Sequence, residues 1–500
     1  MCDLPQRSNS DLQVTASCAI PSTPIIRLPT TVLPSTDSTP SFSIKSVNKS
    51  FKHQLRLLRA FVEKEAAKRW KNIRGSPKLV ARVLDVSKGK LCFVVGTVYM
   101  DMPLKPNVLE DIGRDHSIPA PPPLAKIHSQ DDQVMLEDES GRIKLVGVIV
   151  GALGAETNSG EFEVVDLCFP GMAPQAGEDD RMDVDDISQT SVGPGSDAQN
   201  AYVAFLSGLD IGSSPASEAQ TQVLVEYLTG ACGDLDGQGF ASQISRVVIL
   251  GNSLAPLGAN GMVVDEEKEK EKEDKRSRRH GNDTVTFSPH PVHSLSAHLH
   301  DLSESVALHI LPGESDPSGT ILPQQALPRA MLGPTSSYAS FYCETNPTYI
   351  RLAFGIKGSG DEADPTELTT SGSTHIRTIL ATSGQPLNDM CKYVPTAPAT
   401  RLDLAEATLH WRHMAPTAPD TLWCHPFFTV DPFIIAETPD IYAIGCQPRF
   451  ATRLVRDGKR RSRVVLVPSF AQTGVLVLVG LTSLNVRIVR LTEDILTRSA

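Results

Sequence analysis

The chain has 500 residues and a formal net charge of −11. This length exceeds one compact core, so we expect two or more domains with tails. The acidic balance argues against a protein that grips nucleic acid over a broad basic face, because phosphate neutralisation needs clustered Lys and Arg, although a small local patch is still allowed. Nine cysteines without a Cys-x-x-Cys pair indicate reduced thiols in an intracellular compartment. Neither a secretory signal nor a run of about 18 apolar residues is recognisable, so we expect no secretion and no transmembrane span.

The N-terminal third predicts a tail, a helix and a small barrel. Residues 1–45 are rich in Ser, Thr and Pro and cannot bury enough apolar surface, which predicts a disordered tail. Within residues 46–75, apolar side chains recur every three or four positions from Phe51 to Trp70, which predicts a helix. Residues 76–170 change to short β-branched runs separated by turns, typical of an OB-type barrel; the expected strands are 79–86, 91–99, 134–136, 142–150 and 162–169.

The remainder of the chain predicts a linker and an α/β layered domain. Residues 171–199 are acidic and glycine-rich, which indicates a solvated linker. From residue 200 to residue 500, apolar runs bounded by Gly, Ser or Pro alternate with helical patterns, as buried strands in a layered sheet should. Two insertions, 257–285 and 357–375, interrupt this domain as surface loops. The expected strands are 201–206, 247–250, 306–311, 441–444, 463–467, 475–479 and 486–491, with a helix at 216–229.

Four of these strands are followed by short turns that read SGLDIG, GNSLA, GESD and GCQP at 207–212, 251–255, 313–316 and 445–448. Close N and O donors on rigid strand-end loops are what a pair of catalytic metal ions needs. Here at most one carboxylate remains at the ligand positions of each of two turns, Asp210 and Asp316. Because two metals need on the order of six or more protein ligands, we expect no metal, no cofactor and no catalysis at these turns.

The turns resemble those of calcineurin-like phosphoesterases, in which Asp-x-His, Gly-Asp-x-x-Asp, Gly-Asn-His-Asp/Glu and Gly-His-x-His motifs follow successive strands. The resemblance implies that ligand positions have lost their donors, and serine cannot replace imidazole as a ligand for a catalytic transition metal. The degenerate positions are Gly208, Asp210, Asn252, Ala255, Ser315, Asp316, Cys446 and Pro448.

Longer motifs carry a second resemblance. The stretches DPSGTILPQQ at 316–325, RHMAPTAPDTLW at 412–423, LEDESGRI at 136–143 and SRVVILGN at 245–252 resemble the small (B) subunits of replicative DNA polymerases, and the polymerase delta type most closely. The resemblance implies an OB barrel packed on an inactive phosphoesterase domain in a nuclear scaffold. It implies binding to the cysteine-rich C-terminal domain of a catalytic subunit and to a third, clamp-recruiting subunit. It implies contact with DNA that is at most indirect or weak, and no membrane.

Two features leave alternatives open. Relatives carry a longer segment between the strand at 142–146 and the one that begins at Gly147, so either the barrel is shortened or the sequence reflects a mis-predicted splice junction. We favour the second, because a lost strand would expose an unpaired barrel edge. For function, the alternatives are the B subunit of polymerase epsilon or alpha, an active metallophosphoesterase or nuclease, and a single-strand DNA-binding module. The last would need aromatic platforms and a basic groove, whereas 76–170 has few aromatic residues and many acidic ones.

Overall fold

The computed structural model describes residues 25–27, 58–106, 124–146, 151–175, 201–231, 235–256, 289–355, 374–395, 400–425 and 431–491. Most of the predicted tail and acidic linker, residues 257–285 and 357–373 of the predicted insertions, and the questioned junction at 147–150 lie outside this set. Within the predicted disordered tail, Ile25–Arg27 form strand β1, which pairs antiparallel with Leu352–Ile350. The sequence pattern of residues 1–45 predicts no strand here. In the described residues no helix is long and apolar enough to cross a membrane.

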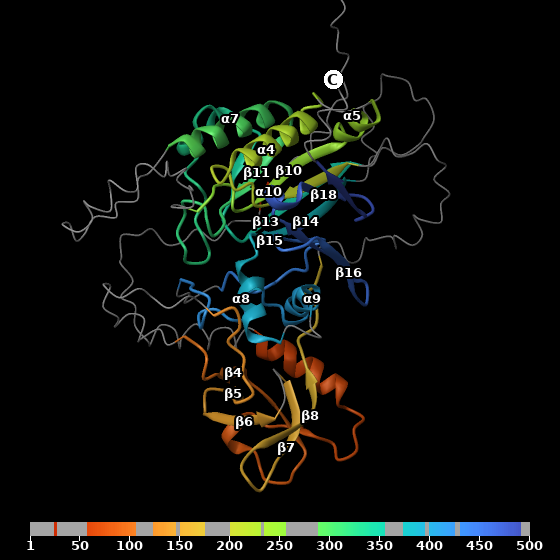
Figure 1. Cartoon of the computed structure of the whole chain (residues 1–500). Helices are drawn as coiled ribbons and strands as arrows, with labels where there is room; N and C mark the ends of the chain where they lie inside the picture. Colours follow the sequence, from red (N-terminus) through yellow and green to blue (C-terminus); the bar gives the residue numbers. More distant parts are fainter. Residues whose placement is uncertain are drawn as a thin grey trace, which may run out of the picture.

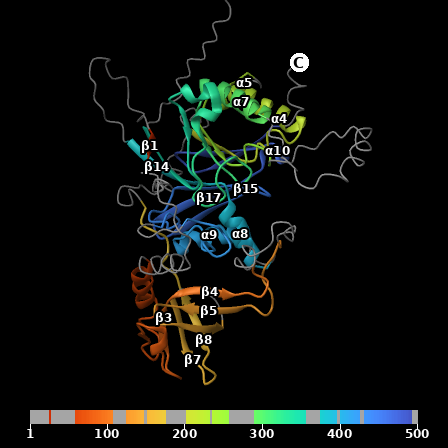
Figure 2. The same ribbon diagram turned by 90° about the vertical axis from the view of Figure 1, so that its left-hand side faces the viewer.

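The first folded unit is a helix packed on one coiled sheet. Residues 58–69 are helical, and Ala66 and Trp70 lie buried against Phe93 and Leu153. The seven-stranded sheet has the order β2-β3-β7-β8-β6-β5-β4 (Figure 2). Its strands are β2 Lys78–Leu79, β3 Cys92–Val95, β4 Thr97–Asp101, β5 Gln133–Glu137, β6 Arg142–Val146, β7 Gly151–Glu156 and β8 Phe162–Cys168.

The expected closed barrel is not observed. Strands β2 and β4 stand at the two ends of the sheet, and no ladder joins them among the described strands. The two ends of the sheet are nevertheless close along the chain, because only Gly96 separates β3, near one end, from β4 at the other. A Cβ at Gly96 would lie 2.8 Å from both Glu137 O and Leu136 Cγ, so the close approach of β5 there requires glycine.

The strand predicted at 79–86 was wrong beyond its first residue. After Leu79 the chain enters a 3-10 turn, η1 Val83–Asp85. The Asp138 carboxylate causes this, because its Oδ2 accepts a hydrogen bond from Val83 N at 2.7 Å while Oδ1 accepts from Ser140 N at 2.6 Å. A side-chain acceptor thus takes the donor that a sheet ladder would have used. These hydrogen bonds outweigh burial and lower the pKa of Asp138.

The second unit contains two six-stranded sheets (Figure 1). The first has the order β1-β13-β14-β15-β17-β16 and the second β12-β11-β10-β9-β18-β19. Strands β9, β10, β11 and β12 run parallel, as do β14, β15 and β17. The bounds are β9 Tyr202–Leu206, β10 Ile244–Leu250, β11 Ala307–Leu311, β12 Phe341–Cys343, β13 Thr348–Gly355, β14 Thr374–Thr382, β15 Ile441–Gln447, β16 Ala451–Asp457, β17 Arg460–Pro468, β18 Val475–Gly480 and β19 Val486–Arg490.

Helices cover the outer face of each sheet, so this unit has four layers. One core lies between the sheets, a second lies under α4 and α7, and a third lies under α8 and α9. Along β15, Tyr442 and Ile444 enter the core beneath α8 and α9, whereas Ile441 and Ala443 enter the core between the sheets. Burial on both faces explains why these strands are continuous apolar runs. The helices are α4 Pro215–Leu228, α5 Leu235–Ala241, α7 His290–Ser305, α8 Gln385–Tyr393, α9 Arg401–Trp411 and α10 Phe470–Thr473, with the 3-10 segment η3 Arg329–Ser337.

Helices α8 and α9 lie between the sandwich and the first unit (Figures 1 and 2). Arg412, the left-handed C-cap of α9, donates from Nε to Gly171 O at 2.8 Å and from Nη2 to Met172 O at 3.1 Å. Its guanidinium lies 4.6 Å from the ring centroid of Phe61. On the other side, Lys126 Nζ donates to backbone carbonyls at the end of α8. Side chains from each unit therefore hold the other in place.

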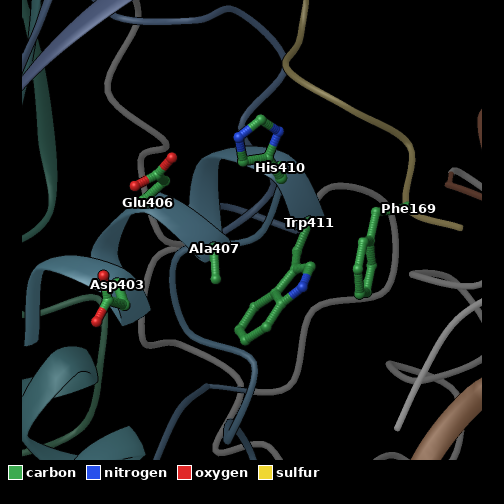
Figure 3. Close-up of a pocket in the computed structure, with 6 residues that line it drawn as sticks. All are labelled: Phe169, Asp403, Glu406, Ala407, His410 and Trp411. Carbon is green, nitrogen blue, oxygen red and sulfur yellow. The ribbon is translucent and has the colours of Figure 1, made fainter. Parts of the chain in front are cut away.

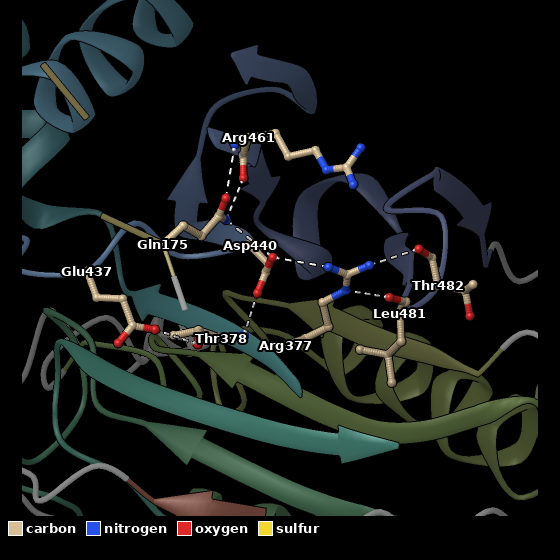
Figure 4. Close-up of polar contacts among 8 residues, drawn as sticks. All are labelled: Gln175, Arg377, Thr378, Glu437, Asp440, Arg461, Leu481 and Thr482. Carbon is tan, nitrogen blue, oxygen red and sulfur yellow. Dashed lines mark hydrogen bonds and ion pairs between the residues drawn. The ribbon is translucent and has the colours of Figure 1, made fainter. Parts of the chain in front are cut away.

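A buried ion pair joins the strands at one end of the sandwich (Figure 4). Asp440, directly before β15, is 1% exposed, and its Oδ1 lies 3.2 Å from Arg377 Nη1. The carboxylate also accepts from Thr378 N at 2.9 Å and from Gln175 Nε2 at 3.3 Å. Arg377 in turn donates to the carbonyls of the turn after β18. This network ties both sheets to the segment that leaves the first unit.

Candidate functional site

Three of the turns singled out in the sequence follow β9, β10 and β11, and the fourth stretch, 445–448, begins inside the C-terminal end of β15; all lie at the opposite end of the sandwich from Asp440. Backbone hydrogen bonds join the first two turns: Gly208 N donates to Gly251 O at 2.9 Å, and Asp210 N donates to Asn252 O at 3.2 Å. Ser207 Oγ accepts from Cys446 N at 2.8 Å, which connects the end of β15 to them. Seven of the eight positions lie on this connected set of turns, and the eighth, Pro448, is exposed beyond the end of β15.

Close packing of glycines lets the turns approach one another. A Cβ on Gly313 would lie 2.2 Å from Asn252 Oδ1, and one on Gly251 would lie 2.7 Å from Gly313 Cα. Three of the predicted positions, Asp210, Asn252 and Cys446, have left-handed backbone with φ between 48° and 53°. That conformation is uncommon for residues other than glycine, so the turns keep a tight geometry without carrying metal ligands.

Asp316 acts as an internal acceptor for neighbouring backbone. It is 5% exposed, and its Oδ1 accepts from Leu254 N at 2.9 Å while its Oδ2 accepts from Gly313 N at 2.8 Å. Ser315, where histidine was expected in an active relative, donates from Oγ to Leu254 O at 2.6 Å. Both side chains therefore hold the turn after β10 against the turn after β11.

Burial is the main cause of the shifted pKa values at this end of the sandwich. It raises the pKa of Asp316 to about 6, even though hydrogen bonds from backbone N–H groups favour the charged form. Burial also raises the pKa of Asp210, whose carboxylate lies 3.3 Å from Ser469 Oγ. The pKa of the Cys446 thiol is raised by burial and then by the charges of Asp316 and Asp210. A protonated thiol is a poor nucleophile and a poor metal ligand.

These donors do not fit a two-metal centre. Gly208, Ala255 and Pro448 offer no side-chain donor, the Ser315 hydroxyl is hydrogen-bonded to a carbonyl, and both Asp316 oxygens accept from backbone. Among the described residues, no group of three or more His, Cys, Asp or Glu side chains is arranged to hold a metal ion. The Ser315 and Asp316 side chains therefore serve as hydrogen-bond partners of the neighbouring backbone.

An uncharged amide cluster completes this end and was missed from sequence. Asn346 Nδ2 lies 2.7 Å from Gln324 Oε1 and 2.6 Å from Ser383 Oγ, and Gln385 Oε1 lies 2.7 Å from Ser383 Oγ. Gln324 Nε2 donates to Gly313 O at 3.0 Å, which links the cluster to the Asp316 turn. Gln324 falls in the DPSGTILPQQ motif at 316–325, which marked this residue without indicating that it meets Asn346, Ser383 and Gln385.

The described pocket lies elsewhere, along α9 (Figure 3). It has a volume of about 280 Å³ and is lined by Phe169, Asp403, Glu406, Ala407, His410 and Trp411. Phe169 and Trp411 have ring centroids 6.3 Å apart. Arg453 lies 2.8 Å from Asp403 and 2.5 Å from Glu406. The two carboxylates of the pocket are thus already paired, and none of the predicted site residues contributes to it.

A pH titration is expected to isolate the Asp316 carboxyl. Because its pKa in the folded state is raised from 3.8 to about 6, its stabilising contribution is full below pH 3.8 and is lost as pH rises through 6. Relative to Asp316→Asn, which cannot titrate, the wild-type free energy of unfolding should fall by roughly 2–3 kcal/mol between pH 4 and pH 7. Urea unfolding of both proteins across that range measures the difference, and parallel curves would contradict the assignment.

Comparison with known proteins agrees with this architecture. Residues 48–167 match the DNA polymerase delta subunit OB-fold domain, and residues 203–356 and 363–452 match the B subunit of DNA polymerase alpha/epsilon. The chain therefore belongs to the B-subunit family of DNA polymerases. Within that family it belongs with the small subunits of DNA polymerase delta.

Three relatives carry that second assignment. The DNA polymerase delta small subunit of Arabidopsis thaliana is 35% identical over 421 residues, covering 81% of this chain and 83% of the relative. That of Saccharomyces cerevisiae is 30% identical over 482 residues, covering 88% of each. DNA polymerase delta subunit 2 of Drosophila melanogaster is 29% identical over 459 residues, covering 89% of this chain and 93% of the relative. The resemblance predicted from motifs is confirmed.

Proposed function

We propose that this chain is a non-catalytic scaffold subunit of DNA polymerase delta that acts in nuclear DNA replication and repair. We propose further that its four-layered unit is a calcineurin-like phosphoesterase fold whose chemistry has been lost. The observation that supports this proposal is that Asp316 accepts hydrogen bonds from neighbouring backbone N–H groups, while Ser315 donates to a neighbouring backbone carbonyl. The donors of the remaining positions do not fit a pair of metal ions, so the strand ends serve the fold.

The proposed partners are the cysteine-rich C-terminal domain of the catalytic subunit and a third, clamp-recruiting subunit. The junction between the two folded units supports a scaffolding role. Arg412 and Lys126 fix helices α8 and α9 against the first unit, so the two units offer one continuous surface to a partner. A rigid arrangement lowers the entropy that assembly would otherwise cost.

Co-expression with the polymerase delta catalytic subunit, followed by size-exclusion chromatography, tests the proposal. We expect one co-eluting peak that disappears when the cysteine-rich C-terminal domain of the catalytic subunit is deleted. An internal control is the same experiment with the catalytic subunit of polymerase epsilon, which should not co-elute. Separate elution from the delta subunit would refute the scaffold proposal.

The loss of chemistry is tested separately on the purified chain. No hydrolysis of a phosphodiester substrate such as bis-p-nitrophenyl phosphate is expected with Mn²⁺, Mg²⁺ or Zn²⁺ present. Metal-dependent hydrolysis that disappears in the Asp316→Ala variant would overturn the proposal, because that result would require Asp316 to be a ligand.

A further inference from the structure

One edge of the sandwich has a charge opposite to that of the whole chain. Residues 449–463 contain seven Lys or Arg and a single acidic residue, Asp457, and residues 475–491 add Arg487 and Arg490 with no acidic residue. The chain as a whole has a net charge of −11. The β16–β17 and β18–β19 hairpins therefore each carry a local excess of positive charge.

The fold brings these two hairpins to the same side. Strands β16 and β19 end their respective sheets, and β17 packs over β9 while β15 packs over β10. With the sheets stacked in this order, β16 and β18 lie on the same side of the sandwich (Figure 1). A hydrogen bond of 2.8 Å from Arg463 Nε to Leu484 O joins the two hairpins directly.

Some of the cations in these hairpins hold the fold together. Arg453 is paired with Asp403 and Glu406 on α9, and Arg460 donates to Met172 O at 2.7 Å. Asp457, the acidic residue of the hairpin, accepts from Met172 N at 3.1 Å. These contacts lie on the face of the hairpin that is turned towards α9 and the first unit.

The other face gathers guanidinium groups. Arg456 stands directly opposite Arg461 in the β16–β17 ladder, and Arg463 is two residues further along the same face. Arg456 and the turn residue Lys459 are exposed. Like charges directly opposite each other in a ladder are unfavourable, and an anion bound against them would reduce that repulsion. Six of the seven cations at 449–463 are arginine, the residue whose planar fork matches phosphate oxygens.

We propose that the exposed end of the β16–β17 hairpin, an arginine-rich face formed by Arg456, Lys459 and Arg461, is a contact for the phosphate backbone of nucleic acid. The proposal rests on the function proposed above, since a polymerase subunit works beside DNA. Binding through phosphates is independent of base sequence and falls steeply with salt. Arg487 is not part of this face, because it lies 5.1 Å from the ring centroid of Phe240 on α5 and 5.8 Å from that of Tyr202.

The test is a fluorescence-anisotropy titration of the full chain with a labelled DNA duplex and an equally long single strand, each in two sequences, at several salt concentrations. Wild-type protein should bind the two duplex sequences with equal affinity, and likewise the two single-stranded sequences.

Arg456→Glu combined with Lys459→Glu should weaken binding about tenfold or more and reduce the slope of log affinity against log salt by about 2. The matched control, Lys71→Glu with Arg74→Glu, makes the same charge change at exposed residues after the first helix and should keep most of the affinity. If circular dichroism shows that the variant with Arg456→Glu and Lys459→Glu is unfolded, the variant with Arg456→Gln and Lys459→Gln replaces it. A reduced slope of log affinity against log salt is still expected.

Three results would overturn this inference: no DNA binding by the wild type at low salt, equal losses in the hairpin and control variants, or an unchanged salt slope. Loss of polymerase subunits from the hairpin variant without any loss of DNA affinity would show that the face binds an acidic protein surface, which also overturns it. Assembly with the catalytic subunit is measured in parallel by size exclusion. A wild-type chain that fails to assemble refutes the proposed function, whereas the DNA titration judges the basic face alone.

Discussion

Replacing Asp316 by alanine is expected to lower the free energy of unfolding by about 3 kcal/mol at neutral pH. The carboxylate is the acceptor for Leu254 N and Gly313 N, and both residues are buried. Without it these donors lose their partner, and each orphaned buried donor costs about 1–3 kcal/mol. Removal of a buried charge offsets part of that loss. Urea unfolding followed by circular dichroism measures the change.

A neighbouring carboxylate provides the control for this variant. Glu314 lies two residues away on the same turn and is exposed, so Glu314→Ala should change stability by no more than about 0.5 kcal/mol. An Asp316→Ala variant that folds as stably as the Glu314→Ala variant would show that the carboxylate does not hold the turns together.

Replacing Arg377 by methionine is expected to cost about 3–5 kcal/mol, the largest effect that we predict. Asp440 is 1% exposed and Arg377 is its guanidinium partner at 3.2 Å. Methionine fills a similar volume but leaves the carboxylate charged and buried, although Thr378 N and Gln175 Nε2 still donate to it. Thermal or urea unfolding of the variant measures the cost.

Two further variants separate the ion pair from simple loss of packing. Arg351 on the adjacent strand pairs with Glu437, and both side chains are about one quarter exposed, so Arg351→Met should cost no more than about 1 kcal/mol. In Arg377→Met combined with Asp440→Leu, no charge is left buried, and we expect this double variant to be more stable than Arg377→Met alone. If the loss in free energy of unfolding in the double variant equals the sum of the losses in the Arg377→Met and Asp440→Leu single variants, the two residues are not energetically coupled.

Local sequence pattern predicted much of the fold because helix and strand periodicity is written within a few consecutive residues. The helix expected at 216–229 is α4 at Pro215–Leu228, and the run at 201–206 is β9 at Tyr202–Leu206. The strand expected at 79–86 failed because its donor at Val83 is taken by Asp138, 55 residues away. No local pattern records such a distant competitor.

At the candidate site, the residue types alone show which side-chain donors are missing, because Gly208, Ala255 and Pro448 offer no side-chain ligand wherever they lie. The sequence motifs were also sufficient to predict the family. The fold was needed to show that Asp316 accepts from a turn 62 residues away and that Asn346 meets Ser383. Only the structure brought the two basic hairpins to one edge, because strand order and register are set by packing across the whole chain.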